Sequence, residues 1–302
     1  TFINHTLLIT ISEIIMFGVP IILFYSIVSE YYNKKAQSDT YDLTNAKEFF
    51  SIRTISFKNI VLTVVVAVTT IIVMYCFRQL IYNVYYLITE RTRLLGVNII
   101  NSNKTISTSN IQQLIILVIS VVILPAILEE LTFRGMLNGC CKYYSRSMII
   151  VLSTVCFVFL HNDIAQVLLF IPMSIICMVI VIATKNVITS IIIHAFVNLY
   201  AILNIHNKIW FFNIDNLALT NNKIWANIFF SIAVIIILTI LLCVLIFSIK
   251  KGVIKVELTM KEDNTRIINK SYENNKFKVL TLVPFVFNII IYITYFISRM
   301  HH

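Results

Sequence analysis

The stretch that decides the fold is residues 111–135, which read IQQLIILVISVVILPAILEELTFRG. Its apolar part is long enough to cross a bilayer as a helix, because about 20 residues at 1.5 Å rise span about 30 Å. Three ionisable groups close the run: Glu129, Glu130 and Arg134. An ionisable group within a bilayer costs at least about 2.5 kcal/mol, so charges retained there indicate a functional site.

Apolar runs of similar length recur along the whole chain. We count eight, near residues 6–31, 60–85, 111–134, 147–162, 164–184, 187–205, 225–249 and 279–298. The 302 residues are 59% hydrophobic and 13% charged, with a mean hydropathy of +0.88, which excludes an ordinary water-soluble domain. With only 5 Gly and 4 Pro, the chain lacks flexible linkers. The sequence predicts an all-α, multi-pass membrane protein whose bundle of about eight transmembrane helices forms a single domain over residues 1–302.

The basic residues report topology rather than a nucleic-acid partner. The net charge is +10, but Lys and Arg cluster beside the apolar runs and lack aromatic interleaving, so we expect no nucleic acid. Most of them fall on one side of the predicted membrane, which the positive-inside rule makes cytoplasmic. Both termini would then face outward, and the loops at 32–58 and 250–278 inward. The six cysteines follow no spacing typical of disulfides or metal sites.

The acidic pair splits into two chemically different groups. Glu130 and Arg134 are four residues apart, so they share one helical face and can form an ion pair. Glu129 is rotated by about 100° from that pair and has no built-in cation, so it is available as a general base. A salt-bridged helix end at the membrane interface, with a second solvated glutamate, is the plain structural alternative.

Two later segments carry further polar groups at membrane depth. His161 ends an apolar run, and His194 and Asn198 share one face of another. Each admits a structural reading: a hydrogen-bonded interface histidine for the first, and a bond that holds helices together for the second. Taken together, one Glu, two His and one Asn are the groups needed to activate a water molecule and to stabilise an oxyanion.

These residues form three ordered motifs. They are Glu-Glu-x-x-x-Arg at 129–134, Phe-x-x-x-His at 157–161 and His-x-x-x-Asn at 194–198. The order resembles the CAAX prenyl protease and bacteriocin-processing family of membrane peptidases (CPBP, or Abi). The resemblance covers about residues 111–205, which it implies to be the catalytic core, with flanking helices in 1–110 and 206–302.

The resemblance implies a role for each residue. Glu129 would activate the attacking water with help from His161, His194 and Asn198 would stabilise the oxyanion, and Glu130 with Arg134 would support the helix. Members of the family have been described both with and without a metal. If a metal is bound, Glu129, His161 and His194 would be its ligands, an acceptable zinc set. We favour a glutamate mechanism with no cofactor, because Glu130 is committed to Arg134 and could not replace Glu129 as the base.

The implied activity is endoproteolysis of a membrane-associated or lipid-modified peptide or protein, with membrane lipids as the other partners. The Ile-, Asn- and Lys-rich composition indicates a bacterial cell membrane and so favours pheromone or bacteriocin precursors over prenylated tails. A bacteriocin-immunity or regulatory protein that binds without turnover is the main alternative, and a small-solute transporter is the second.

Two further expectations concern geometry. With the third span starting at Ile111, Glu129 and His161 would lie at different depths, so we expect that span to start earlier and a buried turn over 135–147 to bring the groups together. Glu13 and Arg78 are single charges in the first two spans. Mutual pairing or snorkelling explains them, and we assign them no catalytic role.

Overall fold

The computed structural model describes residues 2–38, 49–89, 111–141, 144–161, 164–207 and 221–262. These residues are almost entirely helical and contain no strand, which confirms the all-α membrane fold. Five helical stretches among them are long and apolar enough to cross a membrane: Thr6–Ile27, Phe57–Thr89, Ile111–Cys140, Val167–Thr184 and Ile224–Lys251. Two shorter apolar helices, Arg146–Val158 and Val187–Leu203, accompany them. The eighth predicted span, 279–298, lies outside the described residues.

The first span comprises α1 (Phe2–Glu13), η1 (Ile14–Gly18) and α2 (Val19–Ser38), followed after a gap by α4 (Phe57–Thr89). The third span comprises α5 (Ile111–Leu117), η2 (Val118–Ile123), α6 (Leu124–Glu130), η3 (Leu131–Met136) and α7 (Leu137–Cys140). The remaining helices are α8 (Arg146–Val158), α9 (Ile164–Thr184), α10 (Val187–Asn207) and α11 (Asn221–Glu262).

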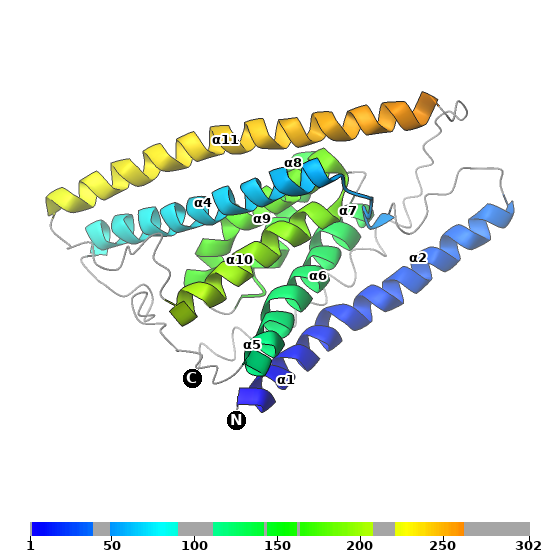
Figure 1. The fold of residues 1–302 in the computed structure, drawn as a ribbon, viewed down its shortest axis with the longest axis horizontal. Helices are drawn as coiled ribbons and strands as arrows, with labels where there is room; N and C mark the ends of the chain where they lie inside the picture. Colours follow the sequence, from blue (N-terminus) through cyan, green and yellow to red (C-terminus); the bar gives the residue numbers. More distant parts are fainter. Residues whose placement is uncertain are drawn as a thin grey trace.

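The helices form one bundle around α9 and α10 (Figure 1). α4 packs against α9, α10 and α11, and α8 packs against α9. The third span crosses the bundle beside α10, and α1 starts next to α5 at the same end of the molecule (Figure 1). From there the first and third spans run in the same direction and diverge, so the first span contacts the bundle through the third.

The third span is interrupted by two π-helical segments, η2 and η3, on either side of α6. Pro125 contributes to the first interruption, because it lacks the N–H that an α-helix would direct to the carbonyl of Val121. π-helical turns are rare and often lie at functional sites, because they re-aim the side chains that follow. Here they bracket Glu129 and Glu130.

The third span continues beyond its predicted end at residue 134, and two phenylalanines pack against this extension. Phe49 and Phe50 are buried and contact each other at 5.6 Å between ring centroids. A Cβ atom on Gly139 would lie 2.7 Å from the Phe49 backbone oxygen, and one on Gly135 would lie 3.1 Å from the Phe50 ring. Because glycine has no Cβ, Gly135 and Gly139 let Phe50 and Phe49 pack this closely against the helix.

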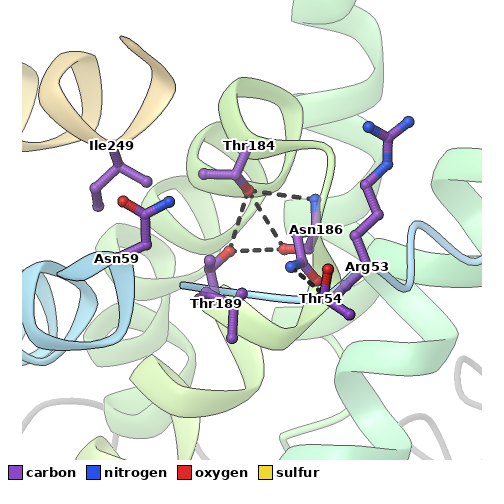
Figure 2. A pocket seen from close by; sticks show the side chains of 8 residues that line it. Arg53, Thr54, Asn59, Thr184, Asn186, Thr189 and Ile249 are labelled. Atoms are coloured by element: carbon purple, nitrogen blue, oxygen red, sulfur yellow. Dashed lines mark hydrogen bonds between the residues drawn. The ribbon is translucent and has the colours of Figure 1, made fainter. Parts of the chain in front are cut away.

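The turn between α9 and α10 is tied to the segment before α4 (Figure 2). The Asn186 amide donates to the carbonyl of Arg53 at 2.9 Å, and the Val187 N–H donates to the carbonyl of Ser51 at 2.8 Å. Thr189 donates to the Asn186 carbonyl at 2.7 Å. These bonds fix the start of α10 and therefore the height of the polar side chains that it carries.

Candidate active site

Glu130 is the polar centre of the bundle. Its side chain is fully buried, and its Oε1 atom lies 3.0 Å from the Arg134 guanidinium and 2.9 Å from Nδ1 of His194. A carboxylate held by a guanidinium only accepts hydrogen bonds, so Nδ1 of His194 carries the proton and donates it. Glu130 therefore does more than pair with Arg134: it also fixes the orientation of His194.

Arg134 is fully buried and contacts the helices around it. It donates to the Ser174 hydroxyl of α9 at 2.8 Å and to the Ser174 carbonyl at 3.3 Å. Its guanidinium carbon lies 4.4 Å from the centre of the Phe157 ring, within the range of a cation–π contact. The ion pair thus connects α6, η3, α8, α9 and α10.

Glu129 lies beside this network but is not part of it. The residue is 8% exposed, and its Oε2 atom is buried without a hydrogen-bond partner. The nearest imidazole atom is Nε2 of His194, at 3.9 Å. His194 therefore stands between the two carboxylates, donating through Nδ1 to Glu130 and presenting Nε2 toward Glu129. A gap of 3.9 Å between two polar atoms suits a molecule that both can contact.

His161 reaches the site through aromatic contacts. Its ring packs 4.4 Å from the Phe170 ring and 5.3 Å from the Phe157 ring, and its Nδ1 lies 3.3 Å from the Phe157 carbonyl. The Phe157 ring also contacts His194, at 5.7 Å. The two histidines therefore flank one phenylalanine, and the bond to the Phe157 carbonyl leaves Nε2 of His161 as its other polar atom.

The depths of Glu129 and His161 agree for a reason that differs from our prediction. The third span continues to Cys140, so Glu129 lies about 16 Å before its end, and His161 lies about 22 Å after the start of α8 at the same end. The difference is only about 6 Å. The predicted buried turn over 135–147 is wrong, because Gly135 is helical and residues 144–147 are exposed. Residues 90–110, where the earlier start of this span was predicted, lie outside the described part.

Asn198 lies one turn beyond His194 on α10 and holds that helix against η2. Its amide donates to the carbonyl of Val121 at 3.3 Å. This is the carbonyl that Pro125 leaves without its usual helical donor. The bond uses one of the two amide N–H groups, so the other remains for a second acceptor.

The three residues considered as metal ligands do not form a metal site as they lie here. Among the described residues, no group of three or more His, Cys, Asp or Glu side chains is placed to hold a metal ion. Glu129 and His194 approach each other, but Nδ1 of His194 is committed to Glu130 and the contacts of His161 are to Phe157 and Phe170.

Sequence reasoning missed the side chains that support the site. Ser174 gave one usable signal, because it is a hydroxyl in the middle of an otherwise apolar run. From the sequence, Phe157 was only the first residue of the Phe-x-x-x-His motif. In the structure it contacts Arg134, His161 and His194. Arg78 does not need an acidic partner, since its guanidinium lies 5.0 Å from the centre of the Tyr75 ring.

Comparison with known proteins identifies the segment that carries the site. Residues 111–200 match the family described as Type II CAAX prenyl endopeptidase Rce1-like. The match begins at α5 and ends within α10, so it contains the three motifs and the elements that join them. No curated protein and no solved structure matches the chain.

Proposed function

We propose that this membrane protein, whose residues 111–200 belong to the CAAX prenyl endopeptidase family, cleaves a membrane-associated or lipid-modified peptide with Glu129 as the base. The observation that carries the proposal is the buried Oε2 atom of Glu129, which has no hydrogen-bond partner and lies 3.9 Å from Nε2 of His194. A buried polar atom without a partner costs free energy, so its retention favours a role with a bound group.

The proposed reaction is hydrolysis of a peptide bond. Glu129 accepts a proton from water, and the water oxygen bonds to the scissile carbonyl carbon. The C–N bond then breaks, and the proton held by Glu129 passes to the leaving amine. The products are a new carboxylate and a new amino terminus.

His194 stabilises the oxyanion that forms on the carbonyl oxygen. The bond from Nδ1 to the Glu130 carboxylate orients the ring so that Nε2, when it carries a proton, can donate to the oxyanion. The second N–H of Asn198 is the other proposed donor. His161, whose ring contacts Phe157 as the ring of His194 does, assists in holding the water. The proposed steps use a glutamate base and no metal.

The substrate is expected to enter from the lipid. The site lies on membrane helices, and an apolar or lipidated segment stays in the hydrocarbon while its polar bond reaches Glu129. Peptide pheromone and bacteriocin precursors of a bacterial cell membrane are the substrates that we favour, with prenylated protein tails as the third class.

Comparison of membrane-peptide termini by mass spectrometry tests the proposal. Cells would express wild type, Glu129→Gln, Glu30→Gln as a control at an exposed position of α2, or no protein, with equal accumulation verified. We expect new termini with wild type and Glu30→Gln only. If Glu129→Gln gave the same termini as wild type, the proposed base would be wrong; if no variant produced termini but all gave a phenotype, binding without turnover would be favoured.

A further inference from the structure

A second carboxyl group lies on the first span, opposite the proposed base. Glu13 ends α1 and leads into the π-helical segment η1, which contacts α6. Its Oε2 atom is buried and has no hydrogen-bond partner, the same condition as Oε2 of Glu129. Neither the resemblance nor the site described above uses Glu13. An unpartnered carboxyl oxygen inside a membrane bundle requires a physical explanation.

The packing of the first and third spans places the two carboxyl groups at matching heights. The spans start at the same end and run in the same direction (Figure 1). Phe17 contacts Phe133 with ring centroids 6.1 Å apart, and a Cβ on Gly18 would lie 3.9 Å from the Leu128 side chain. Glu13 lies four residues before Phe17, and Glu129 lies four residues before Phe133, so each carboxyl group lies about one turn before its phenylalanine in these parallel spans.

Electrostatics agree with this placement. Glu13 lies close enough to Glu129 for the two carboxyl groups to interact electrostatically, and Glu130 and Arg134 lie within the same range. The groups facing Glu129 are therefore Glu13 from the first span, Glu130 and Arg134 from its own span, and His194 from α10. Arg134 is bound to Glu130 and Ser174, so its charge is shared between Glu130 and Glu129.

Two carboxylates that face each other in a low-dielectric site do not both stay charged. A base that takes a proton from water must be the charged member, so the other must be neutral and can donate a hydrogen bond. We infer that Glu13 is a positioning residue of the active site, whose neutral carboxyl group donates to Glu129 and aims its free oxygen at the attacking water. This role rests on the proposed function, whereas the pairing of the two groups does not.

Cross-linking tests the pairing without any activity. The chain carrying Glu13→Cys and Glu129→Cys would be treated in membranes with a short bifunctional thiol reagent, and the joined peptides would be identified by mass spectrometry. The matched control carries Ile14→Cys in place of Glu13→Cys, since Ile14 is the next residue and is 44% exposed. We expect a 13–129 product and little 14–129 product. Equal yields, or none from the first pair, would overturn the inference.

Two substitutions at position 13 test the role. Glutamine keeps the shape of a neutral carboxyl group and its ability to donate, so Glu13→Gln should keep most of the wild-type kcat. Leucine keeps the helix and the apolar contacts but cannot donate, so Glu13→Leu should lower kcat about ten- to a hundredfold with little change in KM. The assay is cleavage of the peptide identified by its new termini, with equal amounts of folded protein.

The outcomes separate the pairing from the function. Equal kcat for Glu13→Leu and wild type, or equal losses for both substitutions, would overturn the positioning role even if the cross-link forms. Absence of cleavage by wild type would overturn the proposed function and the role that rests on it. The cross-link would still decide whether Glu13 and Glu129 face each other.

Discussion

Replacement of Arg134 by leucine tests the buried ion pair that organises the site. The change leaves the fully buried Glu130 carboxylate without its guanidinium, 3.0 Å away in the wild type. It also removes the bond to Ser174 and the contact with the Phe157 ring. Removal of one partner from a buried ion pair costs about 3–5 kcal/mol. We therefore expect Arg134→Leu to lower the free energy of unfolding by about that amount.

A second substitution separates charge from packing. Glutamine at position 130 keeps an oxygen that can accept from Nδ1 of His194 but carries no charge. Adding Glu130→Gln to Arg134→Leu removes the uncompensated carboxylate, so the double variant should be about 1–3 kcal/mol more stable than Arg134→Leu alone. The folded fraction against denaturant in lipid nanodiscs measures both values. A double variant as unstable as Arg134→Leu, or less stable, would refute a charge-based account of the pair.

Three further predictions follow from the packing and the site. Gly139→Ala should destabilise the fold by about 1–3 kcal/mol in the denaturant assay, because its Cβ would lie 2.7 Å from the Phe49 backbone. Gly18→Ala meets only ordinary contacts at 3.6 Å or more, so it should be neutral in the same assay. Asn198→Leu should cost about 1–3 kcal/mol, since the Val121 carbonyl loses its donor; unchanged unfolding would show that this bond contributes little. A metal chelator should leave the cleavage rate of purified protein unchanged, and an inhibition reversed by added zinc would contradict the glutamate mechanism.

The sequence was sufficient to predict the helices and the pairing of Glu130 with Arg134, because both depend on local patterns. Long apolar runs identify membrane helices, and the spacing of Glu130 and Arg134 places them on one face. The order of the motifs also pointed to the CAAX protease family, which the match to residues 111–200 confirms. The roles of Glu129, His161, His194 and Asn198 in catalysis stay predictions.

The features of the fold that could not be predicted depend on contacts between residues far apart in the sequence. The third span reaches Cys140, and its Gly135 and Gly139 pack against Phe50 and Phe49. These contacts join residues that are 85 or more positions apart in the sequence, so no local pattern predicts them. The π-helical segments around α6 also shift the faces that a regular helix would present.

The position of Glu13 relative to Glu129 also could not be predicted from the sequence. As a single charge in the first span it could be interpreted as a snorkelling or paired residue. Only the parallel packing of Phe17 on Phe133 indicates that it faces Glu129. Residues that act together across two spans therefore need the fold before they can be recognised as a group.

The most direct test of the account is the cleavage rate of purified protein in lipid vesicles. The substrate is the peptide identified by its new termini, and the proteins are wild type, Glu129→Gln and Glu30→Gln. Loss of a general base lowers rates by about 10²–10⁴-fold, so we expect that loss for Glu129→Gln and a wild-type rate for Glu30→Gln. Cleavage by folded Glu129→Gln at the wild-type rate would contradict the claim that Glu129 activates the water.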